Sequence, residues 1–424
     1  SIEDLFTYRT AAELAKRAKP TNSPVVPASV EVSSPVSELN STAELILAEF
    51  REALASETMT ATDDFFDFGG HSLIATRVIG RLLTHHGIEI SINDLFGNPT
   101  AQSLAEQAVP KSTEFLEPAT SLTDVGSPLA PLSLAQNSLW KAIPKYAKFG
   151  LNTIFNLPFV LRFFDELDEV AFGEACRDIL VRHATLRSHF YEHDGNPCQQ
   201  VVDVSDIGNY KWFWTSDECE TEDKDEFLKQ EAIHPFDLEK EFPLRVRFIR
   251  CKETGQQFLS FLFHHIVQDE WSVNLMMDEL SLAYKLRVQG QPPAWRHEAL
   301  PMHEYARMQR GSGTHQKHLD YWLDNLKGVP WSTPIFPKNH PLSEKADPQG
   351  AKGGWVIIEI EDNVRDGLYA LAKQQSASLF NVVYASIAAA LNAVGAPNKL
   401  IVGTSASGRQ DVEYYDTIGY FTTV

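Results

Sequence analysis

Two stretches of the chain have almost the same sequence, and this repeat limits how the first hundred residues can fold. Residues 1–18 read SIEDLFTYRTAAELAKRA and residues 91–108 read SINDLFGNPTAQSLAEQA, with ten of the 18 positions identical and no gap. Each copy predicts a turn at Asp-Leu-Phe and then a helix that begins near a threonine, Thr10 or Thr100. We therefore expect residues 1–18 to be the tail of one small domain, and the complete second copy to end near residue 108.

Prolines mark a linker on either side of the second copy. Residues 19–40 contain four prolines, and so do residues 109–131. Proline fixes a backbone dihedral and removes a hydrogen-bond donor, so these stretches are expected to be extended. The linkers separate a small unit, residues 41–108, from a larger body, residues 132–424.

The charge balance and the apolar pattern exclude several classes of partner. The 424 residues include 37 basic and 57 acidic side chains, a net charge of −20, whereas nucleic acids and anionic membranes bind concentrated Lys and Arg. The four cysteines form no Cys-x-x-Cys pair, which favours reduced thiols. The longest apolar tract, 379–394, is too short to span a bilayer, and the N-terminus has no signal-peptide pattern. We expect a piece of a soluble cytoplasmic protein with no nucleic-acid or membrane partner.

The small unit is predicted to be helical. Ser41-Thr-Ala-Glu44 matches a capping box that would begin a first helix. A long loop leads to a second helix with apolar residues from Ile74 to Leu83, and Gly87 is placed to end it.

The larger body alternates strands with helices. Runs rich in Val, Ile and Phe predict strands at 155–163, 244–249, 257–263, 355–360 and 400–402. Helical periodicity occurs at 168–182, 273–287, 317–326, 364–374 and 379–394. This alternation predicts a layered α/β domain, but it does not give the order of the strands.

The motif Gly69-Gly70-His71-Ser72-Leu73 places a serine at a predicted helix start. The N-terminus of a helix carries partial positive charge and free amide donors, which suit a phosphodiester. A serine that simply caps the helix is the structural alternative.

The run DDFFDFGGHSL at residues 63–73, in a small helical unit, closely resembles the peptidyl carrier (thiolation) domain of nonribosomal peptide synthetases. The resemblance covers residues 41–108 and implies a four-helix bundle. It also implies that a phosphopantetheinyl transferase attaches 4′-phosphopantetheine to Ser72, and that the thiol of this group carries an acyl chain. Residues 1–18 resemble the end of another carrier domain.

Two adjacent histidines end the strand predicted at 257–263, in the sequence His264-His265-Ile-Val-Gln-Asp269. Neighbouring residues on a strand point to opposite faces, so the two imidazoles are not expected to bind one metal ion. A zinc site would also need two or three further ligands at suitable spacing, and the sequence offers none. We expect no metal, with one histidine facing a cleft and the other packed inward.

Four stretches, in the right order, resemble the condensation domain of nonribosomal peptide synthetases. They are SLAQNSLW at 133–140, RHATLRSHF at 182–190, His264-His265-x-x-x-Asp269, and Gly408-Arg409 followed by IGYF at 418–421. The resemblance implies an α/β fold like that of chloramphenicol acetyltransferase, with two lobes and a tunnel between them. The second lobe would be incomplete in this chain.

The same resemblance assigns roles to the residues of the histidine motif. His265 would be the general base on the attacking nucleophile, or would orient it. Asp269 is expected to pair with Arg187, because a buried carboxylate needs a partner. His264 would support the loop.

This chain departs from the family pattern at several positions. Glu270 stands where the family has glycine, and Thr422-Thr423 replaces Val-Asn. Residues 303–307 match their motif poorly, and the sequence stops at Val424. The geometry for the acceptor substrate is therefore open.

Three functions remain open on the sequence. The first is an enzyme that joins carrier-bound acyl chains through amide or ester bonds. The second is a condensation-like module that recruits another protein without chemistry. The third is a stand-alone acyltransferase, which the attached carrier with Ser72 disfavours.

Within the enzyme interpretation, two carriers in a row resemble the end of fungal cyclodepsipeptide synthetases of the enniatin, beauvericin and bassianolide type. This implies iterative coupling and ring closure, with an upstream tandem carrier and with adenylation and methylation modules as partners. An ordinary elongating domain that forms an amide bond is the alternative.

Overall fold

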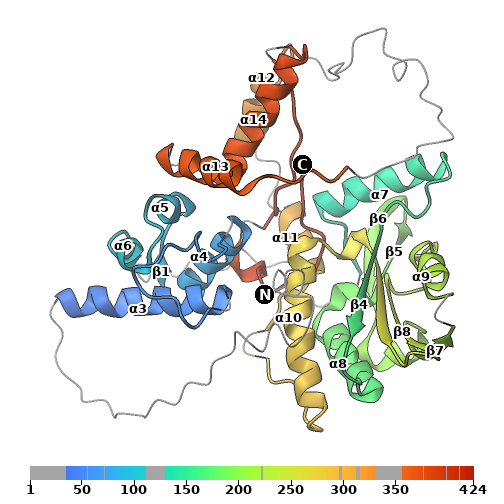
Figure 1. Ribbon diagram of the computed structural model, residues 1–424. Coiled ribbons are helices and arrows are strands. Elements are labelled where there is room, and N and C mark those ends of the chain that lie inside the picture. The colour runs from blue at the N-terminus through green and yellow to red at the C-terminus, as the bar shows by residue number, and fades with distance from the viewer. Residues whose placement is uncertain are drawn as a thin grey trace. The chain divides into compact units, whose positions relative to one another are not determined.

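The computed structural model describes residues 35–424 except 55, 71, 111–128, 221–222, 296–297, 312–315, 330–355, 376, 398 and 410 (Figure 1). The expected carrier tail at 1–18 and most of both expected linkers lie outside the described residues. The chain divides into two compact units. One comprises Ser1–Leu116 with Ile357–Ala390, and the other comprises Glu117–Val356 with Leu391–Val424.

Two longer and two short helices form the described N-terminal part of the first unit. They are α3 (Pro35–Ala53), α4 (Ser72–His86), α5 (Ile92–Gly97) and α6 (Ala101–Ala105). A minimal antiparallel ladder joins β1 (Ile88–Glu89) to β2 (Val109–Pro110). Their core is formed by apolar side chains with no exposed surface, including Ile46, Phe50, Phe65, Val78, Leu82 and Leu95.

The start of the first helix differs from the sequence prediction. The capping box expected at 41–44 is wrong, because α3 already begins at Pro35 and contains those residues. Proline suits the first position of a helix, where its missing N–H has no partner to lose and its fixed φ fits. Part of the expected linker at 19–40 is therefore helix.

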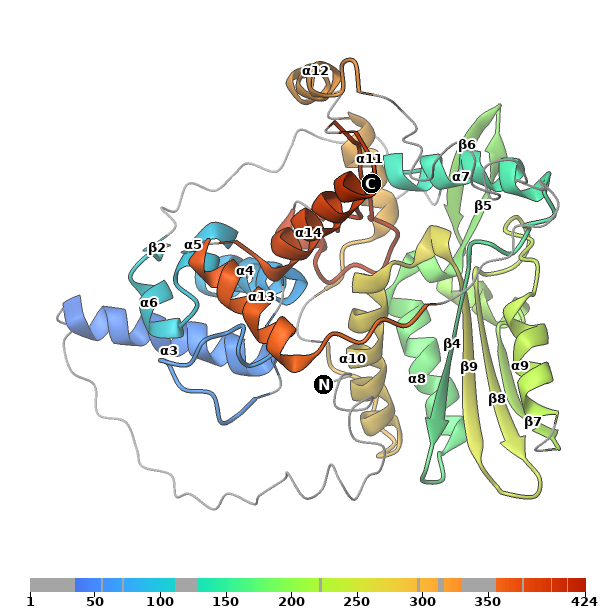
Figure 2. The ribbon, with the colours of Figure 1, turned by 45° about the horizontal axis from the view of Figure 1, so that its top comes forward.

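A four-stranded sheet forms the centre of the second unit. Its order is β4 (Asn156–Phe163), β9 (Gln257–His264), β8 (Leu244–Cys251) and β7 (Phe213–Cys219). The first three strands pair antiparallel, and β7 runs parallel to β8. Every residue of β9 is buried, because α8 (Glu169–Arg182) and α10 (Glu270–Arg287) cover one face and α9 (Lys224–Ala232) covers the other (Figures 1 and 2). The strands predicted at 155–163, 244–249 and 257–263 are confirmed.

A second, antiparallel sheet contains β3 (Leu129–Pro131), β6 (Asn196–Val201) and β5 (Ser188–His193). Asp194 and Gly195, both with positive φ, make the tight turn between β5 and β6. β2 and β3 lie at the two ends of the stretch expected to be a linker, 109–131, so that prediction is wrong at both ends. The helix α7 (Leu134–Ala147) follows.

Two salt bridges, one largely buried and one partly exposed, join the neighbouring helices α8 and α10. The Arg182 guanidinium donates to Glu279 at 2.8 Å, and the His183 imidazole contacts the other oxygen of the same carboxylate at 2.5 Å. One turn before Arg182 on α8, Asp178 accepts two hydrogen bonds of 2.6 and 2.7 Å from Arg287 at the end of α10. Burial lowers the pKa of His183, which therefore favours the neutral imidazole.

The remaining helices are short. They are α11 (Met302–Gly311), α12 (Gln316–Asn325), α13 (Asp362–Gln374), α14 (Leu379–Ala393) and the 3₁₀ turns at Ala184–Arg187, Val204–Asn209 and Val412–Tyr414. The predicted helices at 168–182, 273–287, 317–326, 364–374 and 379–394 correspond to α8, α10, α12, α13 and α14.

Two predicted strands are wrong. Residues 356–360 and 400–402 have no regular structure, and Val356, Ile357 and Ile358 are 80–88% exposed. A β-branched run forms a strand only where a neighbouring strand pairs with it, and no described strand pairs with these residues.

Within the described ranges, no single helix is long and apolar enough to cross a membrane. Only the pair α13 and α14 reaches that length and composition, with a bend of 108° between them. The described part of the chain also contains no cluster of three or more potential metal ligands.

Candidate functional site

Two glycines shape the turn before α4. Gly69 has a φ of +94°, which favours glycine. The Gly70 amide donates to the Phe65 carbonyl at 3.0 Å, and a Cβ at Gly70 would lie 2.3 Å from the buried Phe65 ring. The close approach of the chain to Phe65 therefore requires glycine at position 70.

This turn places Ser72 at the first position of α4, a helix of 15 residues. The first turn of α4 contains no acidic side chain, so none there offsets the positive end of the helix dipole. A phosphodiester on this serine fits that electrostatic environment. The structure describes neither His71 nor the Ser72 side chain, so the fit rests on the glycine turn and the helix start.

The two histidines lie where β9 ends. His264 is the last residue of the strand, and His265 begins the 3₁₀ turn His265–Val267. The His264 amide donates to the Pro243 carbonyl at 3.0 Å, and the His265 amide donates to the Phe155 carbonyl at 2.8 Å. The structure buries the His264 side chain and leaves His265 half-buried.

The contacts of His265 fix its tautomer. Its Nδ1 lies 2.6 Å from the Gln268 carbonyl oxygen, and because a carbonyl only accepts, Nδ1 carries the proton. The neutral ring then has its free electron pair on Nε2. The Tyr420 ring packs edge to face against His265, with 4.9 Å between the centroids.

His264 has the contacts of a structural residue. Its Nδ1 accepts a hydrogen bond from the Ile266 amide at 3.2 Å, and the Phe155 and Phe236 rings lie beside it. Burial, with a smaller contribution from the neighbouring His265, lowers the pKa of His264 to about 3. His264 is therefore neutral near pH 7.

Asp269 connects α10 to the C-terminal loop. It caps α10 by accepting from the Ser272 amide at 2.9 Å, and its other oxygen accepts from the Phe421 amide at 3.0 Å. The Arg409 guanidinium lies 3.3 Å from Asp269, and the two side chains are 0% and 1% exposed. A buried carboxylate thus has a cationic partner and two amide donors.

Arg409, the cationic member of the pair, binds the backbone of the C-terminal loop. It donates to the Tyr414 and Thr417 carbonyls, both at 2.7 Å, and to the Ser272 hydroxyl at 2.8 Å. Its guanidinium lies 3.9 Å from the centroid of the Phe421 ring. Burial lowers the pKa of Arg409 from its usual value, and Asp269 opposes this shift.

The expected ion pair between Asp269 and Arg187 is wrong. Arg187 donates to the Leu180, Val181 and Val202 carbonyls at 2.6, 2.9 and 3.1 Å. It satisfies carbonyls at the C-terminus of α8, where a cation is favourable. The Gly408-Arg409 motif contained the true partner of Asp269, but sequence separation gave no sign of the contact.

Sequence reasoning also missed how α7 supports the histidine turn. Ser133 and Gln136 form a capping box at the start of α7, and both are fully buried. The Gln136 side-chain amide donates to the Ile266 carbonyl at 3.2 Å and accepts from Gln199 at 3.1 Å. The available signal in the sequence was Ser133-x-x-Gln136, which matches a capping box.

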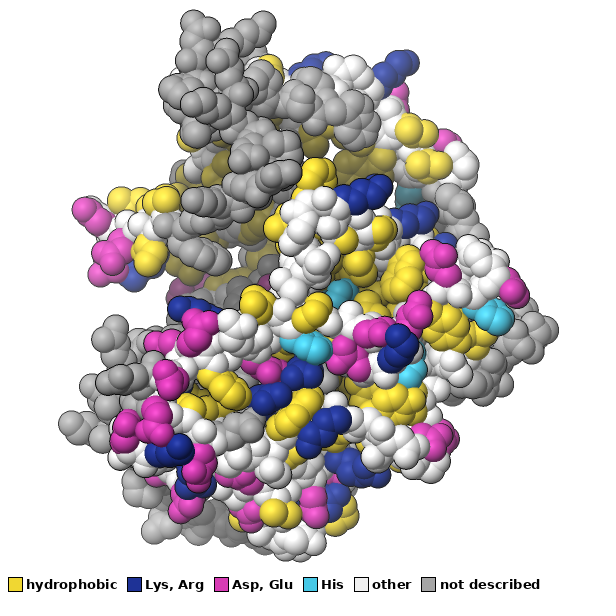
Figure 3. All heavy atoms as spheres, turned by 90° about the vertical axis from the view of Figure 1, so that its right-hand side faces the viewer, with side chains coloured by type: hydrophobic (Ala, Val, Ile, Leu, Met, Phe, Trp, Pro, Cys, Tyr) yellow, Lys and Arg dark blue, Asp and Glu magenta, His cyan; other side chains and the backbone are white. Residues whose placement is uncertain are grey.

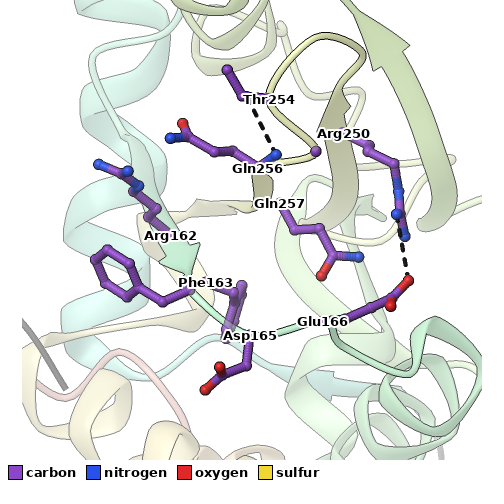
Figure 4. A pocket seen from close by; sticks show the side chains of 10 residues that line it. Arg162, Phe163, Asp165, Glu166, Arg250, Thr254, Gln256 and Gln257 are labelled. Carbon is purple, nitrogen blue, oxygen red and sulfur yellow. Dashed lines mark hydrogen bonds and ion pairs between the residues drawn. The ribbon is translucent and has the colours of Figure 1, made fainter. Parts of the chain in front are cut away.

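One pocket lies far from this site. It has a volume of about 300 Å³, and Arg162, Asp165, Glu166, Arg250 and Gln257 line it (Figure 4). Gln257 and His264 are the two ends of β9, and seven residues of strand span roughly 23 Å. Arg250 lies 3.5 Å from Glu166, so charges of both signs balance within this pocket.

A second pocket, of about 450 Å³, lies beside α9. The face drawn in Figure 3 shows basic, acidic and hydrophobic side chains interspersed. Arg245 and Arg247 line the pocket, pair with Glu231 at 2.6 and 2.9 Å, and lie over the Trp214 ring. Both guanidiniums therefore have partners within the fold.

Removing one charge of the Asp269–Arg409 pair should destabilise the second unit strongly. Asp269→Asn or Arg409→Met leaves the other charge buried without its partner, at a cost of about 3–5 kcal/mol. The double variant should lose less than the sum of the two, by about 0.5–3 kcal/mol. Urea unfolding measures all three, with exposed Asp165→Asn as the control. Additive losses, or single variants as stable as the wild type, would contradict the pairing.

The buried His264 should make stability depend on pH. Below pH 6.5 the unfolded chain takes up a proton at this residue, whereas the folded protein does so only near pH 3. The free energy of unfolding should therefore fall as pH falls through this range, by up to about 1.4 kcal/mol per pH unit for this group. His264→Asn keeps an acceptor for the Ile266 amide and should lose less stability between pH 7 and 5. If the urea midpoints of the wild type and His264→Asn fall equally between pH 7 and 5, this explanation is rejected.

Two family models match the chain. The model described as "Condensation domain" matches residues 128–424. The model described as "Phosphopantetheine attachment site" matches residues 44–108, and carrier domains of this kind bear covalently attached 4′-phosphopantetheine.

Curated relatives agree with both models. The chain is 31% identical over 390 residues to a probable non-canonical nonribosomal peptide synthetase, CymA, of Salinispora arenicola, covering 90% of this chain and 5% of that protein. It is 29% identical over 413 residues to the nonribosomal peptide synthetase kk1B of Curvularia clavata, covering 96% of this chain and 3% of that protein. The chain thus spans a small part of either relative.

Among solved structures, the X-domain from teicoplanin biosynthesis has a similar fold. The TM-score is 0.57 at 22% identity, over 72% of this chain and 66% of that one. Together with the histidine turn and the glycine turn before Ser72, these matches show that the chain belongs to the condensation-domain family of nonribosomal peptide synthetases, with a phosphopantetheine carrier domain preceding the condensation domain.

Proposed function

We propose that the second unit couples an acyl group to a nucleophile at His265, and that Ser72 is the phosphopantetheine attachment site of the carrier. The observation that carries this proposal is the geometry of His265. Its Nδ1–H is held by the Gln268 carbonyl at 2.6 Å, its ring is half-buried, and its Nε2 is left to accept a proton.

The chemistry assigned to His265 is proton transfer during acyl transfer. An amine or hydroxyl attacks the acyl carbonyl carbon, a new amide or ester bond forms, and Nε2 takes the proton that the nucleophile loses. The same proton then returns to the leaving group as its bond to the acyl carbon breaks, so the imidazole ends neutral. The Gln268 carbonyl stabilises the protonated ring during this step.

The other residues of the motif act at a distance from the reacting atoms. Asp269 and Arg409 are buried against each other, so their role is to fix the backbone on both sides of the site. His264 is neutral and buried, and it holds the turn through the Ile266 amide. We assign positioning roles to Asp269, Arg409 and His264, and a fold-stabilising role to Arg187.

The carrier supplies the acyl group. When bound, 4′-phosphopantetheine provides a thiol that holds an acyl chain as a thioester. This chain's own contribution is the tight turn at Gly69 and Gly70 and the positive end of α4, which favour the phosphodiester at Ser72.

We further propose that this unit performs iterative coupling and ring closure of a cyclodepsipeptide, as the end of a fungal synthetase. The support is the repeat between residues 1–18 and 91–108, which predicts an upstream tandem carrier, and the similarity to the Curvularia clavata synthetase. Adenylation and methylation modules would then be further partners. An elongating domain that forms one amide bond is the alternative, and the mass of the products of the intact synthetase distinguishes the two.

The attachment site can be tested by loading. Incubation with coenzyme A and a promiscuous phosphopantetheinyl transferase should add roughly 340 Da to the chain. Ser72→Ala should remove this mass shift completely, whereas Ser56→Ala, in the loop after α3, should keep it. Intact-protein mass spectrometry gives the answer, and loading of Ser72→Ala would move the site elsewhere.

The role of His265 can be tested in the complete synthetase. His265→Ala should lower product formation at least about a hundredfold, because a positioned base contributes about 10²–10⁴-fold, while Ser72 still loads. His193→Ala, on a side chain that is 58% exposed, is the matched control and should keep full turnover. Near-normal turnover by a folded His265→Ala protein would favour positioning alone or a recruitment role.

A further inference from the structure

We propose that Tyr420 is a positioning residue for His265, and that a backbone clamp on residues Ile418 to Phe421 holds its ring against the imidazole. Tyr420 lies in the IGYF stretch at 418–421, and the sequence alone assigns no role to its side chain. The inference rests on the proposed role of His265, but the contact itself can be measured without any turnover.

The clamp consists of three amides bound by three side chains from other parts of the unit. The Gly419 amide donates to the Ser272 hydroxyl and the Phe421 amide to Asp269, both at 3.0 Å. The Ile418 amide donates to Nδ1 of His183 at 3.5 Å. Because Asp269 and Ser272 belong to the start of α10, the segment is fixed to the helix that directly follows the His265 turn.

Close packing leaves this segment little freedom. A Cβ at Gly419 would lie 2.7 Å from the Met302 sulfur and 2.9 Å from the Phe421 ring. Ile418 is 1% exposed and Phe421 is 2% exposed. The backbone therefore cannot shift away from α10 without opening a buried contact.

Tyr420 is the exception within this buried run. Of residues 417–421, it alone is half-buried, and its ring meets His265 edge to face, with 4.9 Å between the centroids and 65° between the planes. The residues on either side of Tyr420 are thus buried, and the Tyr420 ring is left in contact with the His265 imidazole. Together with the Gln268 carbonyl on Nδ1, this contact limits the directions in which Nε2 can point.

The phenol hydroxyl is not needed for this role. Burial, with a smaller contribution from Asp269, raises the pKa of Tyr420, so the side chain stays neutral near pH 7. The ring supplies the contact, and phenylalanine should replace it. An aliphatic side chain would fill the space without an aromatic edge and would let the imidazole rotate.

The test compares Tyr420→Phe with Tyr420→Leu in the complete synthetase. Tyr420→Phe should keep wild-type turnover, and Tyr420→Leu should lower it by roughly two- to tenfold, the range that an aromatic contact supports. Loading of Ser72 and the melting temperature should be the same in both variants. If Tyr420→Leu does not fold, Tyr420→Met replaces it in the test, because the volume of methionine is similar to that of leucine.

A second readout reports on the contact directly. In this chain labelled with ¹⁵N and ¹³C histidine, the His265 ring resonance is identified by its absence in His265→Ala. An aromatic neighbour shifts that resonance, so the shift should persist in Tyr420→Phe and disappear in Tyr420→Leu. If Tyr420 had only a structural role, Tyr420→Leu would lower the melting temperature, and the His265 resonance would be the same in the two variants.

The outcomes separate this proposal from the proposed function. An unchanged resonance and full turnover in Tyr420→Leu would overturn it. Equal loss in Tyr420→Phe and Tyr420→Leu would also overturn it, because the hydroxyl would then be the functional group. If His265→Ala keeps full turnover, the proposed function fails, while the resonance still decides whether Tyr420 orients the ring.

Discussion

The buried pair of Asp269 and Arg409 is the contact on which the site depends. The two residues are 140 positions apart, and their side chains are almost fully removed from water. Charges in such a place require each other and further hydrogen bonds, and here the Ser272 and Phe421 amides and the Tyr414 and Thr417 carbonyls provide them. The start of α10 and the C-terminal loop are therefore held in one arrangement.

The position at which β9 ends explains why two adjacent histidines have different environments. β9 is buried on both faces, so its last residue, His264, packs among Phe155 and Phe236. The chain then turns, and His265 leaves the sheet between the Gln268 carbonyl and Tyr420. The different environments of the two histidines therefore follow from the end of β9 at His264.

Local patterns predicted the parts of this fold that depend on neighbours in sequence. The helices α8 and α10 follow from helical periodicity within each segment, and the strands β4, β8 and β9 follow from local runs rich in Val, Ile and Phe. The run at 356–360 has the composition of a strand but no described pairing partner, so composition misled. The partner of Asp269 could not be predicted for the same reason: Arg187 and Arg409 are both arginines in motifs, and only the fold decides which one reaches the carboxylate.

The neutral state of His264 has a consequence for the histidine beside it. A second cation next to His265 would oppose protonation of the His265 imidazole, the step proposed for it, through Coulomb repulsion at short range. Burial lowers the pKa of His264 to about 3, so a proton taken up at this turn near pH 7 does not reside on His264. Because its apolar environment keeps His264 neutral, this residue places no positive charge beside His265. This difference in burial is consistent with the roles proposed for the two residues, with His264 as a buried support and His265 as the proton acceptor.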